Sequence, residues 1–186
     1  MLTLEFTHFP EITTARLHLR KIAADDTQAL FEMRSNIDAM KFIDRAPATS
    51  IQEAEELLVK INQLFDENNG IGWGISMKND PLLIGTIGFH RIIKEQHRAE
   101  IGYMLHPAHH RNGVMHEAME AVLHHGFHQF RFHSIEANVN PENEASIRLL
   151  EKNRFVREGY FRENHYYNGK FGDTGTYSLP TPLAGI

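Results

Sequence analysis

Short apolar runs, several of which alternate with polar residues, predict the β-strands of this chain. They lie at residues 16–20, 71–77, 83–89, 98–105 and 133–139. We expect the three strands from 71 to 105 to pair antiparallel in sequence order, because turn residues separate them. Nearer the carboxyl end, Asn168-Gly169 predicts the turn of a β-hairpin between residues 164–167 and 174–178.

Other segments repeat apolar residues every three or four positions, the spacing of a helix with one buried face. Asp25 or Asp26 can cap a short helix, and a longer helix begins at Ser50 and ends near Gly70. The apolar positions that define the predicted helices are Ala29, Leu30 and Met33 in the first, Ala54, Leu57, Leu58, Ile61, Leu64 and Phe65 in the second, Met115, Ala118, Met119, Val122 and Leu123 in a third that starts at Val114, and Ile147, Leu149 and Leu150 in a fourth that starts at Asn143.

The order of these elements predicts an α/β (α+β) domain, in which helices cover the faces of a mixed sheet. The 186 residues are enough for one domain with a sizeable core. No repeat, low-complexity tract or linker divides the chain, so we expect a single domain over residues 1–186.

Composition narrows the classes of function. With 41% hydrophobic and 23% charged residues and no long apolar run, the chain reads as soluble, and its first residues do not read as a signal peptide. A cytoplasmic location without a membrane partner is the expectation. The net charge of −5 argues against direct binding of nucleic acid and is compatible with a cationic substrate.

Cysteine and histidine counts bear on metals and on covalent chemistry. The absence of cysteine excludes disulfides, thiolate metal ligands and a cysteine acyl-enzyme intermediate. The 13 histidines include two groups that invite comparison with a zinc site. Neither group has an obvious convergent carboxylate, so packed or solvated histidines are the better account and no metal is expected. These groups are His106, His109 and His110, and His124, His125 and His128.

Gly113 lies between the predicted strand 98–105 and the long helix that starts at Val114. The first turn of a helix has free backbone N–H groups and the positive end of the helix dipole, and both favour bound phosphate. A glycine there lets the backbone approach the phosphate closely. The alternative is an ordinary connection between a strand and a helix.

The order and spacing of several segments resemble the GNAT-type N-acetyltransferases, and within them the branch that includes the ribosomal-protein N-terminal acetyltransferases. The resemblance runs from about Thr14 to Ser178. It rests on Thr14-Ala15-Arg16-Leu17-His18-Leu19-Arg20 with Asp25-Asp26, Leu83-Ile84-Gly85-Thr86-Ile87-Gly88-Phe89, Ala99-Glu100-Ile101-Gly102-Tyr103, Gly113 with Glu117-Ala118, Gly126-Phe127, residues 143–152, Gly159 and Asp173.

Some positions depart from the family pattern. Where the pyrophosphate loop of the family begins with Gln or Arg and ends with Gly or Ala, this chain has His110 and Met115. A methionine side chain beside the pyrophosphate would narrow or shift the loop. Leu150 stands where many members have the tyrosine that serves the departing thiolate, and Arg154 stands where many have glycine.

The resemblance implies a core of about residues 14–178, a mostly antiparallel, twisted sheet, and a V-shaped cleft that holds acetyl-CoA as co-substrate. Strand 98–105 is expected to splay from strand 133–139, so that backbone groups of Tyr103, Met104 and Leu105 bind the pantetheine arm. The residues that the resemblance assigns to the coenzyme are Met104, Leu105, His110, Arg111, Asn112, Gly113, Val114, Met115, His116 and Asn143.

A thioester is attacked only by a neutral amine, so a group that accepts the proton helps the reaction. Glu100 resembles a family position that often has this role. The alternative is a structural ion pair with a neighbour such as Arg98. Ser146 or Tyr103 is expected to assist the thiolate, although Ser146 also reads as a plain first-turn helix serine. Since there is no cysteine, direct transfer in a ternary complex is the natural scheme.

The expected function is therefore acetyl transfer from acetyl-CoA to a primary amine, foremost that of a protein or peptide N-terminus. The alternatives are a small amine such as a polyamine, an amino acid or an antibiotic, and a non-catalytic coenzyme A-binding or interaction protein. A homodimer is compatible with all of these.

Overall fold

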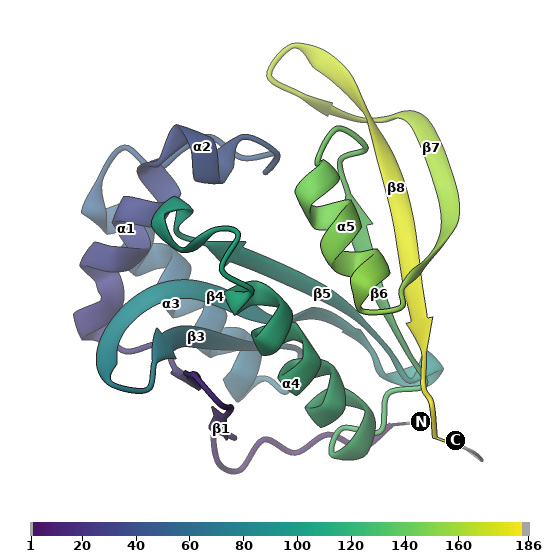
Figure 1. Ribbon diagram of the computed structural model, residues 1–186, viewed down its shortest axis with the longest axis horizontal. Helices are drawn as coiled ribbons and strands as arrows, with labels where there is room; N and C mark the ends of the chain where they lie inside the picture. Colours follow the sequence, from purple (N-terminus) through teal and green to yellow (C-terminus); the bar gives the residue numbers. More distant parts are fainter. Residues whose placement is uncertain (1, 184–186) are drawn as a thin grey trace.

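The strands form one eight-stranded sheet in the computed structural model, which describes residues 2–183 (Figure 1). The strand order is β1-β2-β3-β4-β5-β6-β8-β7, and every neighbouring pair is antiparallel except β5 and β6. The strands are β1 Ile12–Thr13, β2 Leu17–Lys21, β3 Ile71–Met77, β4 Asp80–Ile93, β5 Arg98–Leu105, β6 Ser134–Val139, β7 Val156–Tyr167 and β8 Lys170–Pro180.

Helices cover both faces of the sheet: α1, α2 and α3 lie on one face, and α4 and α5 on the other (Figure 1). Beneath α4 is the main core, which contains Trp73, Phe89 and Phe132. Within residues 2–183, no helix combines the length and apolar character needed to cross a bilayer. The helices are α1 Thr27–Ser35, α2 Ile37–Met40, α3 Ile51–Asp66, α4 Val114–His128 and α5 Glu144–Lys152, with short 3-10 turns η1 Ala24–Asp26, η2 Lys94–Gln96 and η3 Pro107–His109.

The structure confirms the predicted order of elements and the antiparallel run of β3, β4 and β5. It also confirms the hairpin turn at Asn168-Gly169, where both residues have positive φ. The predicted hairpin strands were too short, because β7 extends back to Val156. Most side chains of β7 are exposed, so this strand has no alternating apolar pattern that the sequence could reveal.

The sheet divides where β5 meets β6. These two parallel strands pair only from Arg98 to Glu100, against Ser134 to Glu136. Beyond that point β5 continues alongside β4, while β6 continues alongside β8 (Figure 1). The expected splay of the two strands is confirmed, and the edge of β5 that faced β6 has no strand partner from Ile101 to Leu105.

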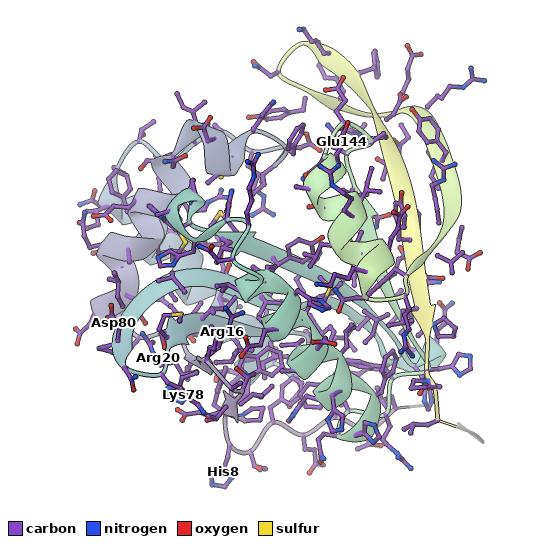
Figure 2. All side chains as sticks on the ribbon, viewed as in Figure 1. His8, Arg16, Arg20, Lys78, Asp80 and Glu144 are labelled. Carbon is purple, nitrogen blue, oxygen red and sulfur yellow. The ribbon has the colours of Figure 1, made fainter. Side chains whose placement is uncertain are left out.

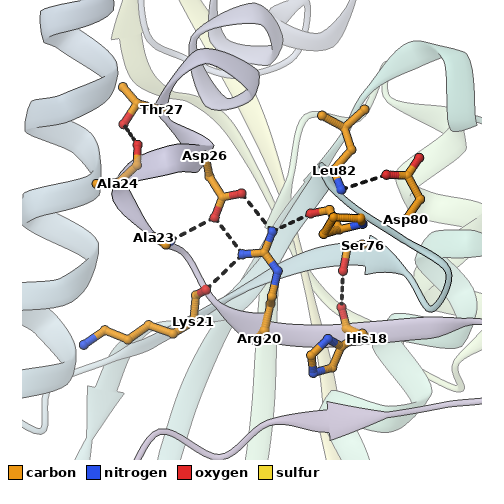
Figure 3. Close-up of polar contacts among 11 residues, drawn as sticks. His18, Arg20, Lys21, Ala23, Ala24, Asp26, Thr27, Ser76, Asp80 and Leu82 are labelled. Carbon is orange, nitrogen blue, oxygen red and sulfur yellow. Dashed lines mark hydrogen bonds and ion pairs between the residues drawn. The ribbon is translucent and has the colours of Figure 1, made fainter.

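A buried ion pair fixes the entry of the chain into α1 (Figure 3). Two nitrogens of the Arg20 guanidinium donate to the two carboxylate oxygens of Asp26 over 2.7 and 2.8 Å. The same guanidinium donates to the carbonyls of Lys21 and Pro81, so it ties β2 to the start of β4. Burial by itself would raise the pKa of Asp26, but Arg20 and the N–H of Ala23 outweigh it and the pKa is lowered.

Replacing Asp26 with Ala should destabilise the fold by about 1.5–3 kcal/mol, because it removes the charged hydrogen-bond partner of the largely buried Arg20 guanidinium. A carboxyl group with a lowered pKa stabilises the fold above its unfolded pKa, near 3.9, and this contribution is lost as the pH falls through the folded pKa. Urea unfolding at pH 7 and at pH 2 measures both effects. Exposed Asp25→Ala is the matched control, and equal losses in the two variants would contradict the assignment.

Candidate functional site

The loop before α4 exposes the side chains of His110, Arg111 and Asn112 and ends at Gly113. Arg111 and Gly113 both have positive φ, at 61° and 73°, and Gly113 caps α4 without any side-chain hydrogen bond. The next two side chains, of Val114 and Met115, are 3% and 8% exposed and pack into the main core. The expectation that the Met115 side chain narrows the loop is therefore wrong. With these two side chains in the core, the free N–H groups that the start of a helix carries would be available to a phosphate.

The sequence predicted Arg16 as a strand residue. In the structure it lies immediately before β2, and its side chain contacts this loop (Figure 2). Its Nη1 donates to the carbonyl of Asn112 over 3.0 Å, and its Nε donates to Oε2 of Glu117 over 2.6 Å. Thr14 also donates to Glu117, so the first turn of α4 is joined to the residues just before β2. The Arg16 side chain is 46% exposed, so its charge remains available to an anion at the loop.

His110 connects the same loop to the end of β5. Its Nε2 lies 2.9 Å from the carbonyl oxygen of Leu105. Further into α4, His116 Nε2 lies 3.6 Å from a carboxylate oxygen of Glu120, one helical turn on. Among the residues assigned to the coenzyme by sequence, His110 to Gly113 are exposed and His116 is partly exposed, whereas Val114 and Met115 can contribute only backbone groups. The exposed stretch could hold a pyrophosphate.

Glu100 is the last residue of β5 that pairs with β6, and a β-bulge in β4 lies opposite it. The bulge makes two residues, His90 and Arg91, face one. His90 Nε2 lies 3.5 Å from one Glu100 carboxylate oxygen, and Arg91 Nη1 lies 3.8 Å from the other. From β6, the amide of Asn138 donates to the same carboxylate over 3.0 Å.

These contacts decide the charge of Glu100. The interaction with His90, helped by Asn138 and Arg91, outweighs burial and lowers the pKa of Glu100. The suggested partner Arg98 pairs instead with Glu136, at 3.6 Å. Glu100 is therefore an ionised carboxylate that faces the His90 imidazole and the Arg91 guanidinium, placed where the two strands diverge. Sequence reasoning missed His90, whose position depends on the bulge.

Two other predicted residues meet across the gap between the diverging strands. Tyr103 of β5 and Ser146 in the first turn of α5 form a side-chain hydrogen bond, while burial raises the pKa of Tyr103 to about 12. Asn143 caps α5 by accepting a hydrogen bond from the Ser146 N–H over 3.1 Å. Leu150, at the position where the family often has tyrosine, is fully buried in the main core. Met104 instead packs on the opposite face, in the cluster under α1 and α3.

The histidine groups are accounted for by packing among rings. His124 and His128 stack on α4 with ring centroids 4.1 Å apart, and His106 and His109 make an edge contact at 6.2 Å. In the described part of the chain, no three His, Asp or Glu side chains converge as a metal site.

The splayed sheet, the N–H groups at the start of α4 and a carboxylate at the point of divergence together define a class: an acyltransferase that holds an extended, phosphate-bearing donor. The model of the acetyltransferase (GNAT) domain matches residues 16–156. The chain belongs to this family, and it is an N-acetyltransferase.

Relatives agree on the class but differ in the acceptor. The chain is 40% identical over 174 residues to the uncharacterized N-acetyltransferase YoaA of Bacillus subtilis, covering 94% of this chain and 98% of that one. A GNAT-family acetyltransferase structure from Bacillus anthracis has a TM-score of 0.82 at 28% identity, covering 92% and 98%. Ribosomal-protein-serine acetyltransferase of Escherichia coli is 29% identical, covering 52% and 54%, and spermidine N(1)-acetyltransferase of Vibrio cholerae is 26% identical, covering 86% and 90%.

Gly113→Val should weaken binding of coenzyme A about tenfold or more. A β-branched residue is strained at φ 73°, and the added side chain would meet the Arg16 guanidinium, whose Nη2 lies 3.4 Å from the Cβ position. A tenfold change in affinity is about 1.4 kcal/mol. The loss of one hydrogen bond between the loop and the charged pyrophosphate is sufficient for a change of about this size. Isothermal titration calorimetry measures the affinity.

Gly169→Val is the matched control for backbone strain. Gly169 has φ 79° in the β7–β8 turn, and nothing lies within 4 Å of its Cβ position. It should lower stability without changing affinity for coenzyme A. If both variants bind coenzyme A as the parent does, the loop is not the pyrophosphate site.

Proposed function

We propose that this N-acetyltransferase uses acetyl-CoA and acetylates the α-amine of a peptide or protein N-terminus by direct transfer in a ternary complex. The loop at Gly113, with Arg16 beside it, would bind the pyrophosphate. The unpaired edge of β5 from Ile101 to Leu105 offers backbone groups to the pantetheine arm. Acetyl-CoA would then reach the point where β5 and β6 part, next to Glu100.

We choose the α-amine as the acceptor because of the residues that surround Glu100. A carboxylate held beside His90, Arg91 and Asn138 is stabilised in its ionised form, so it is a weak base. At pH 7, deprotonating a lysine ε-amine costs about 4–5 kcal/mol, whereas an α-amine costs little more than about 1 kcal/mol. A weakly basic site therefore suits the α-amine.

The leaving thiolate needs a hydrogen-bond donor. Tyr103, with a pKa of about 12, keeps its proton at neutral pH, and its partner Ser146 lies on the other arm of the gap. We propose that this pair donates a hydrogen bond to the coenzyme sulfur as the C–S bond breaks. Asn143 would act on the same arm, since it fixes the helix turn that carries Ser146.

A small polyamine is the second candidate acceptor, because one relative is named a spermidine acetyltransferase. Its primary amines have basicity close to that of lysine, so the same deprotonation cost counts against it.

Glu100→Gln should lower the transfer rate about 100-fold near pH 7 and less at pH 9, where the amine loses its proton unaided. Glu95→Gln, which changes an exposed carboxylate in η2, should behave as the parent. The pH dependence of kcat/KM for a peptide acceptor measures this. If kcat/KM of Glu100→Gln changes with pH in the same way as that of the parent, Glu100 has only a structural role.

Peptides that carry both a free N-terminus and an internal lysine should be acetylated at the N-terminus. The lower deprotonation cost of the α-amine is the reason. Mass spectrometry of the products locates the acetyl group, and N-terminally blocked copies of the same peptides are the control. Acetylation confined to lysine, or rapid turnover of spermidine with none of the peptides, would overturn the proposed acceptor.

A further inference from the structure

A cavity of about 180 Å³ lies between α3 and the central strands β3, β4 and β5, on the face opposite α4. Its floor includes Gly72, Gly88 and Gly102, which are direct partners across the three strands. The apolar side chains of Ile61 and Leu64 on α3 face this floor. The cavity thus lies beneath α3, over a row of three glycines that have no side chains to fill it.

The cavity leaves part of the apolar stripe of α3 incompletely covered. Ala54 and Leu58 of this helix are buried, whereas Ile61 and Leu64 are only partly buried. A cavity of about 150 Å³ with an apolar lining can hold one benzene molecule. The volume beneath α3 therefore suits a single apolar group of about the size of a leucine or phenyl side chain.

Among the described residues, His90 is the only ionisable one in the lining of the cavity. Its ring lies over Gly102, where an added Cβ would be 3.0 Å from Nδ1, and its Nε2 faces Glu100 at 3.5 Å. The other charge near the ring is Arg91, which also faces Glu100, and α3 contributes only Ile61 and Leu64 to the lining. Within residues 2–183 no carboxylate lines the cavity, so no described group there would pair with a second positive charge on an acceptor.

Gly102 links the cavity to the site already described. It contributes to the cavity floor and also belongs to the part of β5 whose edge is unpaired, where the pantetheine is proposed to lie. An amine in the cavity would therefore approach the thioester across Gly102. It would meet His90 before it could reach Glu100.

We propose that this cavity is the acceptor pocket: it holds an uncharged apolar group attached next to the reacting amine, and His90 receives the amine's proton while Glu100 orients the imidazole. This inference rests on the proposed function and deepens it. The acceptors it selects are N-termini with an apolar first residue, and polyamines and acidic N-termini are disfavoured.

The step balances within the groups named. The amine nitrogen forms a bond to the acetyl carbon, the C–S bond breaks, and its electron pair remains on the coenzyme sulfur. The proton leaves the nitrogen for Nδ1 of His90, while Nε2–H donates to the Glu100 carboxylate. The His90 side chain is 51% exposed, so the imidazole can release this proton to solvent before the next turnover.

A series of peptides that differ only in the first residue tests the pocket. From Gly to Ala, Val and Leu, kcat/KM should rise, by up to about fourfold for each methylene buried. Asp-first and Lys-first peptides and spermidine should be poorer than Leu-first. Ile61→Phe, which fills the cavity, should lower kcat/KM for the Leu-first peptide about tenfold or more and spare the Gly-first peptide.

Val59→Phe is the matched control, because Val59 lies on the same helix and is 64% exposed. It should leave the whole series unchanged. If kcat/KM does not change along the peptide series in the parent, or if Ile61→Phe lowers kcat/KM equally for all peptides, the cavity is not the acceptor pocket. If the parent acetylates no peptide or amine at all, the proposed function has failed, which is a different result.

His90→Gln tests the proton acceptor. It should lower the rate about 100-fold at pH 7 and much less at pH 9, and adding Glu100→Gln should lower it little further, since the two residues act as a unit. His18→Gln, on an imidazole of β2 that pairs with Glu11, should behave as the parent. A His90→Gln profile with the parent's pH dependence, or losses that simply multiply in the double variant, would overturn the role of His90.

Discussion

The short pairing between β5 and β6 is the constraint on which the rest of the site depends. Parallel strands that paired along their whole length would use every backbone group between them. Here the pairing stops after Glu100, so the edge of β5 beyond it stays open to a ligand. The same stop brings β6 and α5 close enough for Ser146 to reach Tyr103 across the gap. Cofactor access and the placement of polar groups therefore have one structural origin.

The two faces of the sheet serve different partners in the proposed reaction. On the face of α4, the buried side chains of Val114 and Met115 anchor the helix, and its N–H groups remain for the phosphates. On the face of α3, the aligned glycines leave a hollow instead of a packed interface. The amine and the thioester would meet at Gly102, where the backbone alone separates the two sides.

Paired charges position each end of the site. Glu117 is ionised between Thr14 and Arg16, since their hydrogen bonds outweigh burial and lower its pKa. Glu100 is ionised for a similar reason, with His90 as the leading cause. In both cases the carboxylate is less a free base than a fixed negative charge that orients a neighbouring side chain, the Arg16 guanidinium or the His90 imidazole. The His90 imidazole is therefore the better candidate to accept the proton of the amine.

The sequence by itself determined the elements that local rules control: apolar periodicity marked the helices and inner strands, Asn168-Gly169 marked the hairpin turn, and Gly113 marked the start of α4. Only the tertiary structure decided which distant residues meet. Arg16 and Glu117 are 101 positions apart, and Glu100 and Asn138 are 38 apart. His90 faces Glu100 because of a bulge, and β7 is mostly exposed, so neither left an apolar pattern to detect. Periodicity records which face of an element is buried, whereas contacts between elements depend on how the whole sheet twists, splays and packs.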